Sequence, residues 1–207
     1  MNSSHLTRRP NHQQGVVLLI TLVVLVVLLA GGVAIMRSMN ASLFSAGNLA
    51  FKRDLINQGE RAVSKVLTLF AGSAALATPA ATAANLKAAN YVATPLPTNA
   101  QGVPTALLNN SEFDTVGVAS NDITDTAAQV TIRYVIDRLC TSVGSSATLG
   151  KAGCVYPPSS SDVRGGSSQE IGTRLPPPPS TTYRLSIRVT GPRDTQVFLQ
   201  TSFAKPD

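Results

Sequence analysis

Histidine is confined to one short stretch of this 207-residue chain, and tryptophan is absent. His5 and His12 both precede Gly15, in a polar segment, so a mature chain that has lost this segment contains no histidine. Its absence excludes a Ser-His or Cys-His catalytic pair and a histidine-ligated zinc site. The two cysteines of the chain, Cys140 and Cys154, are too few for a thiolate metal site. We therefore expect neither an enzyme nor a bound cofactor or metal.

Charged side chains are also few. Only 14% of the residues are Asp, Glu, Lys or Arg, and the formal net charge is +6. Without residues 1–15, which contain two arginines and no acid, 15 basic residues face 11 acidic ones, which leaves +4. A solvated surface explains this mild excess better than nucleic-acid binding does. Arg133, Arg184 and Arg188 fall on one face of predicted strands, where we expect a solvated polar face rather than a site for anions or DNA.

The longest feature of the sequence is an apolar run over residues 16–36. These 21 residues carry no charge, and Thr21 is their one polar side chain. At about 1.5 Å per residue, a helix of this length crosses a hydrocarbon core of roughly 30 Å. Arg8 and Arg9 precede the run, and positive charge on that side keeps the amino terminus in the cytoplasm. The sequence therefore predicts one membrane-spanning helix.

Three kinds of protein segment contain such a run. A cleaved secretory signal is disfavoured, because its apolar region usually has about 7–15 residues and ends at a small-x-small cleavage site. A plain single-span anchor fits the length. A prepilin also fits, since its short polar leader is cut after a glycine while the apolar helix is retained. The abrupt start after Gly15 and the helical pattern beyond Arg37 are not required by a plain anchor.

Beyond Arg37 the pattern becomes amphipathic. Apolar or small residues recur at every third or fourth position, as on one face of a helix, namely Phe44, Gly47, Phe51, Leu55, Gly59, Val63, Val66 and Phe70. We interpret this stripe as a face that packs under a head domain, where Gly47 and Gly59 let another backbone come close. The whole helix is expected over residues 16–70. A local bend or a melted segment is expected at Gly31 and Gly32, because each glycine costs about 1 kcal/mol relative to alanine in an aqueous helix.

Two stretches of this helix carry a resemblance to a known family. Residues 14–20 (QGVVLLI) and 46–52 (AGNLAFK) are similar, at this separation, to the amino-terminal region of PilX-type minor pilins, low-abundance components of type IV pili. The resemblance implies that a membrane prepilin peptidase cuts after Gly15 and that the new amino terminus, Val16, is methylated. The chain departs from major pilins at the fifth residue after the cut, where they have glutamate and this chain has Ile20.

The remainder of the chain divides into two parts. Residues 71–129 are rich in Ala, Thr, Asn and Pro and have weak periodicity, which favours a surface connection with one short helix near 83–89, or partial disorder. Residues 130–207 predict an antiparallel sheet head, in which 130–137 alternate as a half-buried strand and 183–204 form a hairpin. A Ser/Gly tract at 159–168 and the prolines at 176–179, an extended connector, lie between them. PilX-type proteins end in a similar strand-turn-strand.

The expected compartment of the head predicts the state of its two cysteines. A head beyond the membrane lies in the periplasm or outside the cell, where disulfides persist, so we expect a bond between Cys140 and Cys154. Two buried thiols are the alternative, and they suit this compartment less well.

The predicted fold class is α+β: a long amino-terminal helix, half transmembrane and half amphipathic, packed on a small antiparallel sheet. The resemblance implies a structural role, as a minor pilin that helps to start or tip a type IV pilus. The chain would be a single-pass protein of the bacterial inner membrane with a periplasmic head, and later part of the cell-surface pilus. Its partners would be the prepilin peptidase, the major pilin and other minor pilins through the helix, and a tip adhesin.

Two alternative functions come from other classes. A tip pseudopilin of a type II secretion system has the same kind of start, but a large helical head would favour it, and the head predicted here is small. A single-span membrane-anchored adhesin or binding module needs no filament, and retention of residues 1–15 in the mature protein would favour it.

Overall fold

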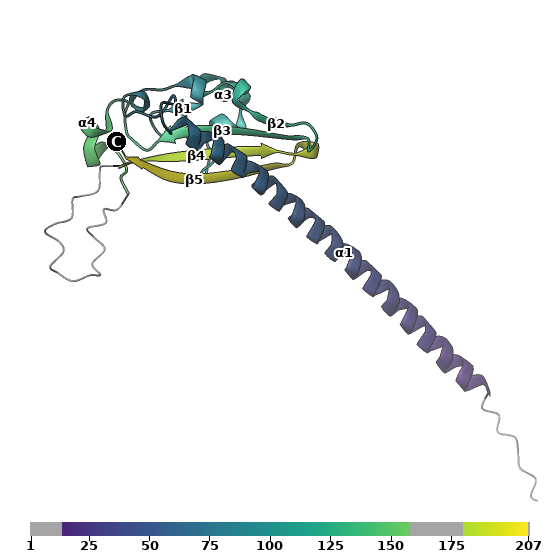
Figure 1. Ribbon diagram of the computed structural model, residues 1–207. Helices are drawn as coiled ribbons and strands as arrows, with labels where there is room; N and C mark the ends of the chain where they lie inside the picture. Colours follow the sequence, from purple (N-terminus) through teal and green to yellow (C-terminus); the bar gives the residue numbers. More distant parts are fainter. Residues whose placement is uncertain (1–13, 158–179, 207) are drawn as a thin grey trace, which may run out of the picture. The chain divides into compact units, whose positions relative to one another are not determined.

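The computed structural model describes residues 14–157 and 180–206 (Figure 1). It contains two compact units, Met1–Phe51 and Lys52–Asp207. The predicted α+β class is confirmed, because one long amino-terminal helix precedes a small sheet. Residues 1–13 of the expected leader, the Ser/Gly tract and the proline segment lie outside the described residues.

Helix α1 (Gln14–Leu69) is a single element of 56 residues. It continues through Gly31 and Gly32, so the helix is not melted at the two glycines. Two glycines cost about 1 kcal/mol each, whereas opening the helix would leave several backbone groups without partners at about 1–3 kcal/mol each. The helix ends one residue before the expected Phe70, and Gly72, with a φ of +57°, turns the chain after it.

The head contains one five-stranded sheet in the order β1-β3-β4-β5, with β2 pairing with β3. The strands are β1 (Tyr91–Val92), β2 (Ile123–Asp125), β3 (Val130–Arg138), β4 (Ser180–Thr190) and β5 (Gln196–Pro206). β4 and β5 form the expected hairpin through the short helix η5 (Pro192–Asp194). β1 runs parallel to β3, so the sheet is mixed rather than antiparallel. The long segment between β1 and β3 supplies the crossover that a parallel pair requires.

One face of the sheet packs on the last turns of α1. Leu55, Ala62 and Val66 of the helix are fully buried. Gly59 lies so close to the sheet that a Cβ added there would be 2.2 Å from Cδ1 of Leu199. Alternate residues of the strands supply the opposing apolar surface, and they include Ile132, Tyr134, Leu185, Ile187 and Val189.

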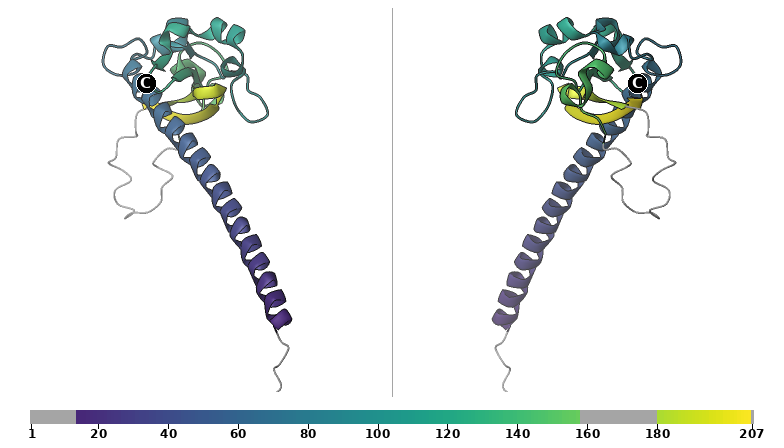
Figure 2. Two further views of the ribbon diagram at one scale, coloured as in Figure 1. Left: turned by 90° about the vertical axis from the view of Figure 1, so that its right-hand side faces the viewer. Right: turned by 90° about the vertical axis from the view of Figure 1, so that its left-hand side faces the viewer.

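The other face of the sheet is covered by residues 71–129, which therefore form part of the head instead of the expected surface connection. The segment contains η1 (Ala81–Ala83), η2 (Lys87–Ala89), α2 (Thr105–Leu108), α3 (Asn110–Val116) and η3 (Ala119–Asn121), with no continuous helix over 83–89. The short helices gather on one side of the sheet (Figure 2). Leu107 of α2 and Phe113 of α3 form a core cluster with Leu96 and with two strand residues, Val92 of β1 and Val135 of β3.

This cover changes the surroundings of β3. The alternation of residues 130–137 predicted a strand with one solvated face, but Val135 and Asp137, on the face predicted to be polar, are fully buried. The covering residues are single apolar side chains separated by prolines and turns, and such a segment has no helical or strand period to detect.

Cys140 and Cys154 form the expected disulfide, and both residues are buried. The bond closes a loop that contains helix α4 (Ser146–Gly153). Beside it, the backbone N–H of Thr141 donates to the carbonyl of Gly153 at 2.7 Å. The mouth of the loop is therefore held by a backbone hydrogen bond as well as by the sulfur atoms.

Candidate functional site: the apolar part of the long helix

Residues 16–36 of α1 expose apolar side chains on all sides of the helix. The large ones have exposed fractions between 50% and 70%. The one polar side chain, Thr21, donates its hydroxyl hydrogen to the carbonyl of Leu18 at 2.9 Å, so it adds no unsatisfied donor. Exposing such a surface to water costs about 25 cal/mol per Å². This part of the helix is long and apolar enough to cross a membrane, where its surface and its internal hydrogen bonding match the hydrocarbon.

The two residues of the predicted cleavage site lie in the first turn of α1. Both Gly15 and Val16 are exposed. A Cβ added to Gly15 would meet nothing within 4 Å. Packing within the described part of the chain therefore does not require a glycine at this position. Recognition by a peptidase would supply such a requirement, and cleavage after Gly15 with methylation of Val16 remains a prediction.

Ile20, the fifth residue after Gly15, has an exposed fraction of 54%. The sequence contains no acidic residue between Val16 and Phe51. Asp54, the first acid of the helix, lies about 50 Å along its axis from Ile20 at the standard rise. No carboxylate of this helix therefore reaches the region around Ile20.

We call residues 37–51 of α1 the neck. The amphipathic stripe predicted that its apolar side chains would be buried under the head, but most of them are exposed. Phe44 was expected to pack under the head, but it has an exposed fraction of 76%. Met39, Leu43 and Leu49 are exposed as well, and Leu55 is the first fully buried residue of the helix. The periodic spacing indicates a face of the helix but does not indicate where an opposing surface begins. The neck is thus a second apolar surface, which sequence analysis assigned to the head.

The two glycines of the stripe also differ. A Cβ added to Gly47 in the neck would meet nothing within 4 Å, whereas Gly59 contacts side chains of the sheet. Within this chain only Gly59 serves the close approach that was expected for both.

The three arginines predicted on the sheet face, Arg133, Arg184 and Arg188, are held by other groups of the head. Arg184 pairs with the fully buried Asp137, with 2.9 Å between Nε and Oδ1. Arg133 pairs with Asp122, with 2.7 Å between Nη2 and Oδ2. Sequence analysis identified the arginines but not these acidic partners, because the partners come from other turns and strands. The expectation of a solvated polar face is therefore wrong.

Arg188 has no acidic partner among the described residues, but it is held by the backbone. Its Nη1 donates to the carbonyl of Leu107 at 2.6 Å. Burial, and then the nearby positive charge of Arg133, lower the pKa of Arg188 below its ordinary value. Burial likewise raises the pKa of Tyr134 to about 12. Both changes follow mainly from packing in the head.

Comparisons with protein-family models, with curated proteins and with solved structures find no match to this chain.

Proposed function

We propose that this chain is a structural minor pilin that helps to initiate or tip a type IV pilus, rather than an enzyme. The observation that carries the proposal is the division of one continuous helix. Residues 16–36 expose apolar side chains on all sides, while Leu55, Ala62 and Val66 bury one face against a small sheet. One helix therefore carries both the apolar segment and part of the head.

The apolar part has two tasks at different times. Before assembly it anchors the chain in the inner membrane, with the head in the periplasm. In the filament it packs against the helices of other subunits. Both surroundings are apolar, so transfer between them exposes little hydrocarbon to water. The exposed apolar residues of the neck, including Phe44 at 76%, extend the surface that the helices of neighbouring subunits would cover.

Processing prepares the chain for assembly in this proposal. The prepilin peptidase removes residues 1–15 by cutting after Gly15, and the new amino terminus at Val16 is methylated. The exposure of both residues on α1 is compatible with access by an enzyme. The Cys140–Cys154 bond suits a head outside the cytoplasm, where disulfides persist.

Ile20 determines the proposed position in the filament. A filament core buries the positive amino terminus of each subunit, and a lone buried charge is costly unless a carboxylate lies nearby. The glutamate of a major pilin supplies that carboxylate for the preceding subunit, but Ile20 does not. A subunit without it is best placed first, where no earlier amine awaits a partner. We therefore place few copies at the tip, together with other minor pilins and a tip adhesin.

The first experiment determines the mature amino terminus. The full chain is produced in a cell with an active prepilin peptidase, and its mass is measured. We expect a chain that begins with methylated Val16. Gly15→Val should retain the leader, because the peptidase site tolerates little side-chain bulk. Gly31→Val is the matched control, since an added Cβ meets nothing within 4 Å there either, and it should be processed normally. An intact Met1 in the wild-type protein contradicts the proposal.

The second experiment locates the protein on filaments. Gold particles directed to the head should label one end of sheared pili, and deletion of the chain should lower the number of pili while their thickness stays unchanged. Uniform labelling at a density near that of the major subunit would rule out the tip position. Loss of type II secretion with normal piliation would instead favour the pseudopilin alternative.

A further inference from the structure

The two edges of the head sheet are built differently. On one side, the outer edge of β3 is shared by β1, with 2 residues, and β2, with 3 residues. On the other side, β5 pairs with β4 along all 11 of its residues. Among the described residues no strand lies beyond β5. One row of its backbone N–H and C=O groups therefore forms the edge of the sheet.

Over residues 196–204, β5 lacks the sequence features that usually protect such an edge. Natural edge strands are short, bulged or covered, or they carry charges and prolines. Residues 196–204 contain no charge, proline or glycine, and their register with β4 is unbroken. Lys205 and Pro206 come only at the end of the strand. In the middle of the strand Gln200, Thr201 and Ser202 are exposed. An edge of this length and regularity is a template for another strand.

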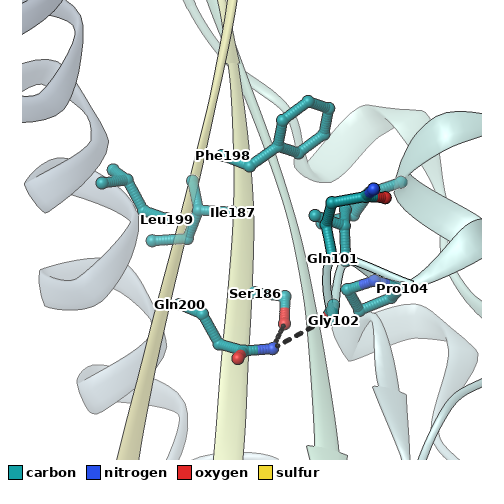
Figure 3. A pocket seen from close by; sticks show the side chains of 10 residues that line it. Gln101, Gly102, Pro104, Ser186, Ile187, Phe198, Leu199 and Gln200 are labelled. Atoms are coloured by element: carbon teal, nitrogen blue, oxygen red, sulfur yellow. Dashed lines mark hydrogen bonds between the residues drawn. The ribbon is translucent and has the colours of Figure 1, made fainter. Parts of the chain in front are cut away.

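A cavity of about 130 Å³ lies beside the middle of β5. Figure 3 shows Ser186, Phe198 and Gln200 pointing from the strands toward the loop that carries Pro104, whereas Leu199 points to the opposite side. Nε2 of Gln200 donates to Oγ of Ser186 at 3.1 Å and to the carbonyl of Gly102 at 3.3 Å. No lining residue is charged. A cavity of about 150 Å³ holds a benzene molecule, so this one has room for an aliphatic side chain.

We propose that β5 is a docking edge for an extended, uncharged segment of another polypeptide, which adds a strand to the sheet and places one apolar side chain in this cavity. Backbone hydrogen bonds along the edge supply affinity, and a pocket for one of the alternating side chains supplies specificity. The docked segment should be uncharged, because residues 196–204 and the cavity contain no charge. A charge buried there would lose its hydration and gain no counter-ion. The docking edge belongs to the head alone, so the inference does not rest on the proposed pilus role.

The test uses the full chain in detergent micelles and a fluorescent seven-residue peptide of alternating Thr and Val with a central Leu. Fluorescence anisotropy should show saturable binding. Two further peptides carry N-methyl groups on alternate amides, so that each blocks one edge of the peptide strand. An added strand pairs along one edge, so one of these peptides should lose binding and the other should retain it. Equal effects of the two methylations, or no binding of the parent peptide, overturn the proposal.

A pair of protein variants tests the cavity. Gln200→Trp fills it and should weaken binding of the parent peptide at least about tenfold, the loss expected when one aliphatic side chain is no longer buried. Gln196→Trp places the same side chain on the same face of β5, away from the cavity, and should bind as the wild type does.

If Gln200→Trp fails to fold, replacement of the central Leu of the peptide by Thr tests the same contact, with the same expected loss. Equal affinity of the two Trp variants, or of the Leu and Thr peptides when that variant does not fold, overturns the proposal. A dimer of the chain that excludes the peptide also overturns it, because the occupant of β5 would then be a second copy.

Discussion

The two parts of α1 have the same backbone geometry and opposite surroundings. Residues 16–49 keep their large apolar side chains exposed, while Leu55, Ala62 and Val66 are fully buried against the sheet. The glycines follow the same division, since Gly47 has open space around it and Gly59 contacts the sheet. The first part therefore depends on surroundings that the chain does not supply, and the second on the chain's own strands. Substitutions should consequently separate into those that change membrane association and those that change the stability of the head.

The largest effect on the head is expected at its buried ion pair. Asp137→Ala removes the partner of Arg184 and the acceptor of the Leu96 N–H, and it leaves a guanidinium without its carboxylate. The free energy of unfolding should fall by about 3–5 kcal/mol. Urea unfolding of the micelle-bound full chain, followed by near-ultraviolet circular dichroism, measures it. The exposed Asp114→Ala should change stability by less than about 0.5 kcal/mol. Equal stabilities of the two variants would show that the pair is not important.

A charge in the apolar run should change membrane association and leave the stability of the head unchanged. Leu25→Asp replaces a residue that favours insertion by one that opposes it, at a cost of about 3–4 kcal/mol at the centre of a membrane helix. We expect extraction of the chain from membranes by alkaline carbonate, with the stability of the head unchanged. Leu43→Asp in the neck is the control, because it introduces the same charge outside the run, and it should remain membrane-bound. Retention of Leu25→Asp in the membrane would contradict the assignment of the span.

The disulfide should affect the head alone. Cys140 and Cys154 are separated by 14 positions, and closing a loop of this size is worth about 3 kcal/mol in the chain-entropy model. The double variant Cys140→Ser/Cys154→Ser should lose about this much stability and remain in the membrane fraction. Thiol labelling of the unreduced wild-type protein should find no free cysteine. Two labels per chain would refute the bond.

The smallest effect is expected at the two glycines of the amphipathic stripe, Gly47 and Gly59. Gly59→Ala places a Cβ 2.2 Å from Cδ1 of Leu199 and 3.2 Å from Cγ2 of Val189. Both side chains must shift to admit the methyl group, so we expect a loss of about 1 kcal/mol. Gly47→Ala meets nothing within 4 Å and should leave the head unchanged while favouring the helix. Thermal unfolding of both variants measures the difference. A stabilised Gly59→Ala would show that the helix and sheet are not in close contact at this position.

Local patterns were sufficient for several features of this protein. The uncharged run at 16–36 predicted an apolar helix, since length and composition alone determine whether a helix matches a bilayer. Two-residue alternation predicted β3 and the hairpin of β4 and β5, because it places successive side chains on opposite faces. The expected compartment predicted the bond between Cys140 and Cys154. Each of these inferences uses neighbours in sequence or a property of the whole chain.

The tertiary structure alone decided which surfaces meet. It paired Asp137 with Arg184, 47 positions away, and it covered the second face of β3 with residues 71–129. It also left Phe44 exposed, although its spacing matches that of Leu55. A periodic sequence specifies a face, but its burial depends on a partner that a distant part of the chain supplies or does not supply. The irregular segment of residues 71–129 has only weak periodicity, so its role became visible only through the contacts that bury it.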